Sequence, residues 1–119
     1  MRIDTVQKNG FYILKVRDNV GPDTDLSKLK FLVEEIIEKG GYDIAVGFLP
    51  KSYLSSNSIA VLISCVRLLK ENGGTLSVVG LAKNMVQILR VLNVQANIIS
   101  TYDTEELFLE AVSKKKSVK

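Results

Sequence analysis

Apolar residues near the start of the chain follow the two-residue period of β-strands. Residues 3–7 alternate in polarity, and residues 11–16 form a β-branched and aromatic run, as strands do. The dipeptide between them, Asn9-Gly10, is a strong signal for a two-residue hairpin turn, because both residues tolerate positive φ. We therefore expect an N-terminal β-hairpin.

The next segment changes to the period of an α-helix. Apolar residues recur on one helical face between residues 26 and 37, and Asp23 or Thr24 can cap the start of such a helix. The dipeptide Gly40-Gly41 ends it, because glycine readily adopts the left-handed conformation that closes helices. The pattern predicts a helix that begins near Asp23 or Thr24 and ends near Lys39.

Two short, almost continuous apolar runs flank the most apolar helical segment. Residues 42–49 and 75–81 are too short for helices in this setting and are typical of buried central strands. Between them, residues 57–71 carry apolar side chains around most of a helical circumference, so we expect this helix to be covered on more than one side. The sequence Asn72-Gly73-Gly74 marks its end.

The last third of the chain continues the alternation of helix and strand. Residues 82–93 predict a helix. Its apolar residues are expected to face inward: Met85, Ile88, Leu89 and Leu92. Residues 96–100 predict a short strand, and residues 103–106 begin a last helix with a capping-box-like sequence. The predicted fold class is therefore α/β, with a mixed, mostly parallel sheet of four to five strands and crossover helices.

Length and composition fit one small domain. The chain has 119 residues, and 46% of them are apolar, which is enough for one core. The longest apolar-rich run is interrupted by Ser64 and Arg67, so no segment is predicted to span a membrane. The start of the chain has no long apolar segment typical of a signal peptide. The lone cysteine, Cys65, is expected to be a buried, inert thiol, and a cytoplasmic location fits these features.

The net charge of +3 comes from the end of the chain. Four lysines lie in residues 114–119, and without them the remaining basic and acidic residues nearly balance. We expect a basic C-terminal tail over residues 114–119 that keeps the protein in solution. The sequence has no RNA-binding aromatic motif and no basic helix face, so we expect no nucleic acid partner.

The groups that most enzymes use are missing from the sequence. The chain contains no histidine, the commonest general base and metal ligand, and it contains neither common glycine-rich nucleotide loop. A phosphoacceptor receiver domain shares the alternating pattern, but its metal site requires carboxylates where this chain has Gly47-Phe48-Leu49-Pro50. We therefore expect no catalytic residue, no metal site and no cofactor.

A polar cluster precedes the most apolar helix. It comprises Ser52, Ser55, Ser56, Asn57 and Ser58. One such side chain is enough to cap a helix, so the cluster exceeds what capping needs. Because a helix N-terminus favours anions, a phosphate or an acidic partner group is the other interpretation, and the residues alone leave both open.

The same cluster opens a longer motif. Ser-Ser-Asn-Ser-Ile-Ala-Val-Leu at residues 55–62 is followed by Lys-Glu-Asn-Gly-Gly-Thr-Leu at residues 70–76. Leu-Arg-Val-Leu-Asn-Val follows at residues 89–94, and Thr-Glu-Glu-Leu at residues 104–107. In order and spacing these segments resemble a STAS domain, the family of bacterial anti-sigma factor antagonists and their relatives. The resemblance covers nearly the whole chain and implies a single STAS-like domain over residues 1–113.

The resemblance also implies a function and its residues. Asn57 falls where the family carries a phosphorylated serine or threonine, and Gly47-Phe48 stands where its third strand often ends in Asp-Leu. Because asparagine cannot be phosphorylated, either Ser56 or Ser58 is the acceptor, or the domain binds without one. The implied partner is an anti-sigma factor of the serine-kinase type. The expected partner-binding residues are Tyr53, Ser55, Ser56, Asn57 and Ser58.

Two other functions remain open from the sequence. One is a ligand-sensing module that binds a small anion or a nucleotide at the polar helix start. The other is a non-catalytic subunit of a larger signalling assembly.

Overall fold

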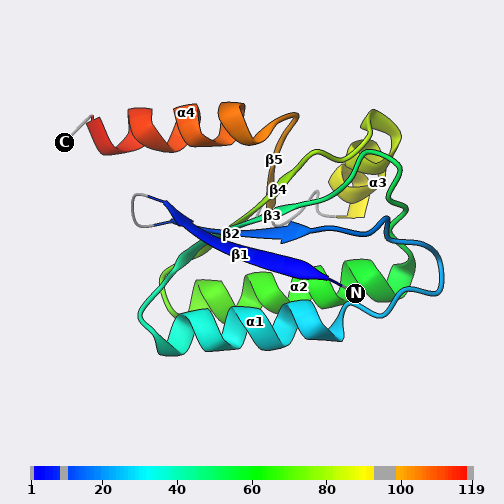
Figure 1. Ribbon diagram of the computed structural model, residues 1–119, viewed down its shortest axis with the longest axis horizontal. Coiled ribbons are helices and arrows are strands. Elements are labelled where there is room, and N and C mark those ends of the chain that lie inside the picture. Colours follow the sequence, from blue (N-terminus) through cyan, green and yellow to red (C-terminus); the bar gives the residue numbers. More distant parts are fainter. Residues whose placement is uncertain (1, 9–10, 93–98, 118–119) are drawn as a thin grey trace.

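The computed structural model describes residues 2–8, 11–92 and 99–117. Within them the chain forms five strands and four helices (Figure 1). The strands are β1 (Ile3–Lys8), β2 (Phe11–Val16), β3 (Asp43–Gly47), β4 (Thr75–Val79) and β5 (Ile99–Tyr102). The helices are α1 (Ser27–Glu38), α2 (Ser56–Glu71), α3 (Lys83–Leu92) and α4 (Glu105–Ser117).

The strands lie in one sheet in the order β1-β2-β3-β4-β5, which is also their order along the chain. β1 pairs antiparallel with β2, and Lys8 opposite Phe11 is the last pair before the predicted turn. The turn residues Asn9 and Gly10 lie outside the described residues. The other pairings are parallel, with α1, α2 and α3 as crossovers. This confirms the predicted mixed, mostly parallel α/β fold.

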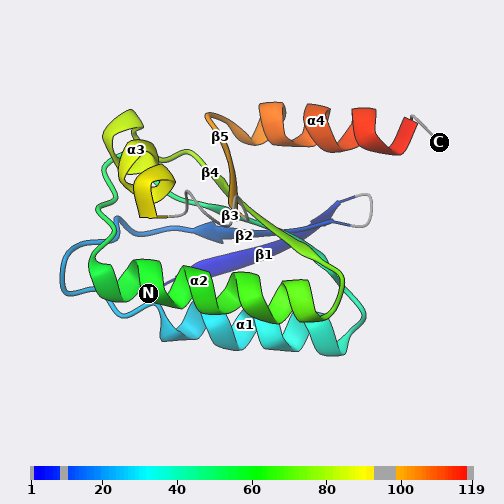
Figure 2. The same ribbon diagram turned by 180° about the vertical axis from the view of Figure 1, so that it is seen from behind.

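Helices cover the two faces of the sheet unequally. α1 and α2 lie side by side against one face, α4 lies across the other, and α3 lies beyond one end of the strands (Figures 1 and 2). Because neighbouring residues of a strand point to opposite faces, β2 directs Leu14 and Val16 toward α1 and α2, and directs Phe11 and Ile13 toward α4. The α1–α2 face holds the larger hydrophobic core.

The Gly-Gly pairs end helices α1 and α2 as predicted. After α2, Gly73 has a φ of +78°, and its N–H donates to Lys70 O while Gly74 N–H donates to Leu69 O. These two bonds form a Schellman motif, which pairs carbonyls that a helix end leaves free. A Cβ on Gly74 would lie 2.0 Å from the Tyr42 carbonyl oxygen, so glycine is required there for packing as well.

The start of α1 differs from the prediction. The helix begins at Ser27, and its N-cap residue Leu26 makes no side-chain capping bond. The two predicted caps lie in the preceding loop, where Thr24 Oγ1 accepts a hydrogen bond from Gly21 N–H. Thr24 thus closes a turn of the loop and does not cap the helix, and the Leu26 side chain, 1% exposed, anchors the end of this loop in the core.

The last third of the chain differs from the prediction at Ile88 and at the end of the last strand. Ile88, predicted to face inward, is 41% exposed, whereas Met85 and Leu89 on the same helix are buried. The last strand continues past its predicted end at Ser100 to Tyr102, and the predicted strand residues 96–98 lie outside the described residues. Helix α4 includes Ser117, so the backbone of the three lysines at 114–116 is helical.

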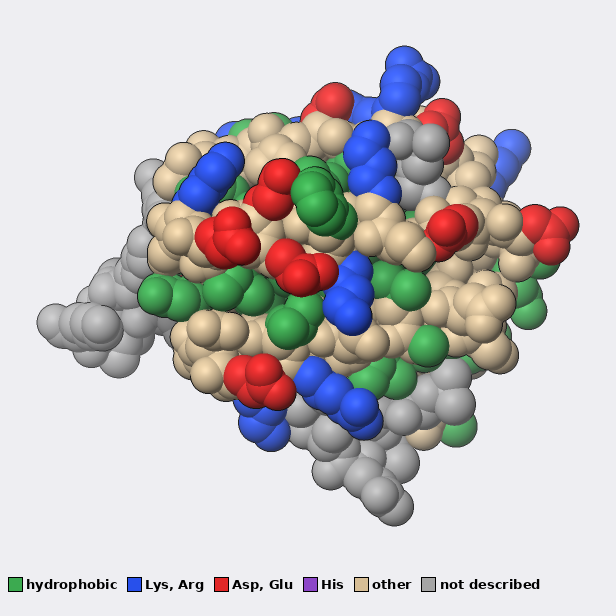
Figure 3. All heavy atoms as spheres, turned by 90° about the horizontal axis from the view of Figure 1, so that it is seen from below, with side chains coloured by type: hydrophobic (Ala, Val, Ile, Leu, Met, Phe, Trp, Pro, Cys, Tyr) green, Lys and Arg blue, Asp and Glu red, His purple; other side chains and the backbone are tan. Residues whose placement is uncertain are grey.

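Charged side chains of both signs lie among hydrophobic ones on the outer face of α1 and α2 (Figure 3). In the described part of the chain, no helix is long and apolar enough to cross a membrane.

Candidate functional site

The segment that joins β3 to α2 alternates between buried and exposed side chains. Ser52 and Leu54 are 3% exposed, while Tyr53 between them is 50% exposed. At the start of α2, Ser56 and Asn57 are exposed, and Ser58 is 1% exposed. The segment therefore holds some residues in the core and presents others to solvent.

Hydrogen bonds anchor this segment on two sides. The Ser52 hydroxyl accepts a bond from Val20 N–H at 3.1 Å, and Tyr53 N–H donates to Val20 O at 2.7 Å. On the other side, Leu54 N–H donates to the Met85 sulfur at 3.1 Å. Because these backbone groups are paired, Tyr53 projects from a fixed backbone and not from a free loop.

Ser55 caps helix α2. Its backbone is extended, and its hydroxyl accepts a hydrogen bond from Ser58 N–H at 3.2 Å. The Ser55 and Ser58 hydroxyl oxygens also lie 3.3 Å apart, in a bond that Ser55 donates. Such a cap satisfies one of the N–H groups that a helix start leaves unpaired.

The five predicted partner-binding residues thus divide into two groups. Tyr53, Ser56 and Asn57 face solvent, whereas Ser55 and Ser58 are engaged in the cap. Of the two predicted phosphorylation candidates, Ser56 is exposed and Ser58 is buried. We call Tyr53, Ser56 and Asn57 the α2-start surface.

A groove of about 460 Å³ adjoins the α2-start surface. Asn57 and Val61 form one wall, and the loop before α1 forms the other with Asp23 and Asp25. Hydrogen bonds from the Ser27 hydroxyl and N–H hold the pKa of Asp25 below its ordinary value, so this carboxylate is charged at neutral pH. The rim of the groove is therefore acidic.

Sequence reasoning did not identify these aspartates as part of the site. They lie more than 30 residues before Asn57, and no local motif links the two segments. The packing of α1 beside α2 brings them together. The burial of Ser58, in contrast, could have been found, because Ser58, Leu62 and Cys65 follow helical spacing on one buried face.

Chemically reactive groups are sparse in the described part of the chain. It contains no group of three or more His, Cys, Asp and Glu side chains that could hold a metal ion. Burial raises the pKa of the Cys65 thiol to about 11, so the thiol is protonated at neutral pH and a poor nucleophile.

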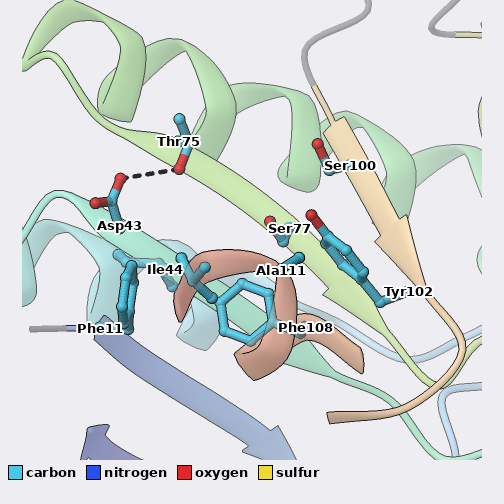
Figure 4. Close-up of a pocket in the computed structure, with 10 residues that line it drawn as sticks. Phe11, Asp43, Ile44, Thr75, Ser77, Ser100, Tyr102, Phe108 and Ala111 are labelled. Atoms are coloured by element: carbon cyan, nitrogen blue, oxygen red, sulfur yellow. Dashed lines mark hydrogen bonds between the residues drawn. The ribbon is translucent and has the colours of Figure 1, made fainter. Parts of the chain in front are cut away.

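A second hollow, of about 140 Å³, lies between α4 and the sheet (Figure 4). Its only described carboxylate, Asp43, already accepts a hydrogen bond from the Thr75 hydroxyl at 2.9 Å. Phe108 of α4 borders the hollow and makes edge-on contacts with Phe11 and Tyr102, at centroid distances of 6.0 and 5.5 Å. These contacts attach α4 to the sheet.

No protein-family model matches the sequence, and no curated protein sequence matches it either. Several solved structures, however, are similar to this one. A Thermotoga maritima protein, described with its crystal structure as a candidate anti-sigma factor antagonist, has a TM-score of 0.77 at 20% identity, over 93% of this chain and 94% of that one. A serine-to-glutamate variant of RsbS from Moorella thermoacetica has a TM-score of 0.78 at 14% identity, over 98% of this chain and 99% of that one.

The phosphorylated form of SpoIIAA, a cell fate determinant from Bacillus, has a TM-score of 0.69 at 12% identity, over 93% of this chain and 99% of that one. At such low identities a likeness establishes the fold. The neighbours agree with the resemblance predicted from the motif that begins at Ser55. The chain therefore has the STAS fold of anti-sigma factor antagonists.

Proposed function

We propose that this protein is a non-catalytic regulatory module of the anti-sigma factor antagonist kind, which binds a partner protein through the α2-start surface. The partner is an anti-sigma factor of the serine-kinase type, and the complex forms in the cytoplasm. One observation supports this most directly: Tyr53, Ser56 and Asn57 are exposed, while Ser52, Leu54 and Ser58 beside them are buried and hydrogen-bonded, and the half-buried Ser55 caps the helix. Such a surface binds without first losing much conformational entropy.

The side chains on this surface fit a protein interface. A half-exposed tyrosine such as Tyr53 offers a large contact area at a low entropic cost, and aromatic residues are enriched in interfaces. Ser56 and Asn57 add hydrogen-bonding groups at a helix start. The acidic groove beside Asn57 favours a partner that brings a basic side chain to this edge.

The acidic groove argues against the anion-sensing alternative at the same place. A phosphate bound at the start of α2 would lie near Asp23 and Asp25, and like charges at short range oppose such binding. We therefore retain partner binding as the proposed function of this surface.

Phosphorylation, if the partner catalyses it, is proposed for Ser56. The Ser56 side chain is exposed, whereas a kinase reaches the Ser58 hydroxyl only after the first turn of α2 opens. A phosphate on Ser56 would add a charge of about −1.5 to −2 to a packed interface. Desolvation of that charge would weaken the complex, so modification would act as a release switch.

The binding experiment uses the full chain and purified anti-sigma serine kinases from the same organism, with interferometry as the measurement. We expect Tyr53→Ala to weaken binding at least about tenfold, as buried aromatic residues at interface centres do. Tyr42→Ala is the matched control, because Tyr42 is 46% exposed and lies at the opposite end of the strands. Equal loss in both variants, or no binding by the unmodified protein, would contradict the proposal.

The switch is tested separately with the same kinase and ATP. We expect phosphate uptake that Ser56→Ala abolishes and Ser58→Ala leaves, as read by intact-mass spectrometry. Ser56→Glu should weaken binding while Ser56→Ala does not. If the kinase transfers no phosphate to the protein, the proposed release switch is refuted. The binding proposal would then depend on the interferometry result alone.

A further inference from the structure

Strand β1 forms one edge of the sheet and is uncovered. It pairs with β2 alone, and no helix passes in front of it in Figure 1. Four of its six side chains are exposed: Asp4, Thr5, Gln7 and Lys8. An uncovered edge strand offers unpaired backbone N–H and C=O groups to another chain.

The pairing of β1 with β2 determines which backbone groups are free. Just before β1, Arg17 N–H donates to Arg2 O at 2.9 Å, so these two residues are a hydrogen-bonded pair of the antiparallel ladder. Such pairs recur at every second residue, so residues 4, 6 and 8 turn their N–H and C=O groups toward β2. The backbone groups of residues 3, 5 and 7 point to the open side. We call the row of backbone groups of Ile3, Thr5 and Gln7 the β1 edge.

The charges on β1 are placed so that the strand complements a second copy of itself. Asp4 and Lys8 lie two residues before and two residues after Val6, and the three side chains share one face of the sheet. If two antiparallel copies place Val6 opposite Val6, each Asp4 lies opposite a Lys8. Arg17 engages only Oδ2 of Asp4, and Lys8 forms no ion pair with another described residue. Both groups are therefore available.

The charges select this register over its neighbours. In it Thr5 lies opposite Gln7, so the free backbone groups of the two copies face one another. A slide by two residues in one direction places Lys8 opposite Arg2, and a slide by four places Asp4 opposite Asp4. Like charges directly opposite each other destabilise a strand pair, and opposite charges stabilise it.

We propose that two copies of this protein associate through the β1 edge, antiparallel, with Val6 opposite Val6 at the two-fold axis. Thr5 of each copy exchanges backbone hydrogen bonds with Gln7 of the other, and two Asp4–Lys8 pairs flank the axis. The contact is small, so the association is weak and depends on concentration. The α2-start surface takes no part in it, so this inference does not depend on the proposed function.

Sedimentation equilibrium of the full chain, at concentrations up to about 1 mM, measures the association. We expect the apparent mass to rise with concentration from 13.2 kDa toward twice that value. A mass that stays at 13.2 kDa over the whole range would overturn the proposal. Growth beyond a dimer would also contradict it, because pairing about a two-fold axis uses up the β1 edge of both copies.

A charge swap tests the register. Lys8→Glu places two acidic groups opposite each other and Asp4→Lys places two basic ones, so we expect each variant alone to self-associate at least about fivefold more weakly. A mixture of the two variants restores both pairs of opposite charges and should associate as the unmodified protein does. Lys83→Glu, on an exposed residue of α3, changes the net charge equally and should have no effect. A mixture that associates no better than either variant alone would refute the register.

Cysteine substitution tests the same register by cross-linking. Val6→Cys places two thiols directly opposite each other at a pair without backbone bonds, where side chains are closest. We expect mild oxidation to give a disulfide-linked dimer. Thr5→Cys is the control, because residue 5 lies opposite residue 7 and its two copies are further apart; the native Cys65 is buried in both variants. A dimer from Thr5→Cys but not from Val6→Cys would contradict the proposed pairing.

A last variant removes a backbone donor. Thr5→Pro deletes an N–H that faces the open side and costs no bond to β2, so we expect a folded monomer by circular dichroism and sedimentation. Unchanged association of the folded variant would refute a backbone contact at this edge. If the unmodified chain stays monomeric and Thr5→Pro instead weakens binding of the serine kinase, the β1 edge pairs with a strand of that partner and the dimer proposal is wrong.

Discussion

The two faces of the sheet are covered in different ways. The α1–α2 face rests on a continuous core in which Leu62 and Leu69 of α2 are fully buried. The α4 face has a smaller cluster, in which Phe108 packs against Phe11 and Tyr102, and Phe108 also borders a hollow of about 140 Å³. The core on the α1–α2 face is therefore larger than the cluster that attaches α4 to the sheet.

The difference bears on the proposed partner surface. The α2-start surface belongs to the layer with the larger core, where close packing holds the backbone in one arrangement. The α4 layer has a smaller cluster and a hollow beside the sheet. We therefore expect the layer that carries the proposed interface to be the more stable of the two.

The largest expected effect is on the α1–α2 face. Leu62→Ala removes a side chain that is 0% exposed, and we expect the free energy of unfolding to fall by about 3–4 kcal/mol, from lost burial and the cavity left behind. Urea denaturation followed by circular dichroism measures it. A loss below about 1 kcal/mol would mean that this layer is not the tightly packed one.

Phe108→Ala is expected to have a smaller and more local effect. It removes both edge-on ring contacts of α4, at a cost of about 2–3 kcal/mol for the lost burial. Hydrogen exchange should accelerate in α4 and β5 but not in α1 and α2, because local unfolding follows the lost contacts. If α2 loses protection equally, the two layers unfold as one unit and the contrast between them fails.

The Cys65 thiol, buried in α2, makes the stability of the α1–α2 layer depend on pH. Burial raises its pKa to about 11, from an ordinary value of 9.0. The thiol therefore loses its proton at a lower pH in the unfolded chain than in the folded protein. The free energy of unfolding declines as the pH rises from about 9 to about 11, by roughly 1 kcal/mol at about pH 10. Denaturation of the protein and of Cys65→Ala across this range measures the difference. Parallel pH profiles would contradict the raised pKa.

Features decided by local chemistry were predictable from the sequence. The Gly-Gly pairs place the ends of α1 and α2, because the left-handed turn they permit depends on adjacent residues alone. The start of α1 was not predictable in the same way. Asp23 and Thr24 are good caps by residue type, but in the structure Thr24 accepts a bond from Gly21 N–H within the loop, and Asp25 accepts the bond from Ser27 N–H.

The candidate site was predictable in part for the same reason. The serine run identified the start of α2, and Tyr53, Ser56 and Asn57 are exposed there, while their role in partner binding stays a prediction. The acidic wall beside Asn57 depends on which elements pack together. Exposure of Ile88 has a similar origin, because α3 lies at the end of the sheet and only a narrow stripe of it, including Met85 and Leu89, is buried.

The smallest expected effects compare the two helix caps. Ser55 caps α2 with a bond from Ser58 N–H at 3.2 Å, and Thr104 caps α4 with a bond from Leu107 N–H at 3.1 Å. Replacement of either residue by alanine should cost about 1 kcal/mol, the usual worth of such a cap. Because the two capping bonds have similar lengths, a difference between the two variants in which helices unfold reflects the layer that each helix belongs to. It does not reflect the strength of the capping bond.

We expect Ser55→Ala to lower the midpoint of global denaturation and Thr104→Ala to act mainly on hydrogen exchange in α4. Ser56→Ala is the control, since its exposed side chain makes no cap and should change stability by less than about 0.5 kcal/mol. A Thr104→Ala variant that shifts the global midpoint as far as Ser55→Ala does would show that α4 is as firmly coupled to the sheet as α2. The smaller cluster on the α4 face would then be no sign of a weaker attachment to the sheet.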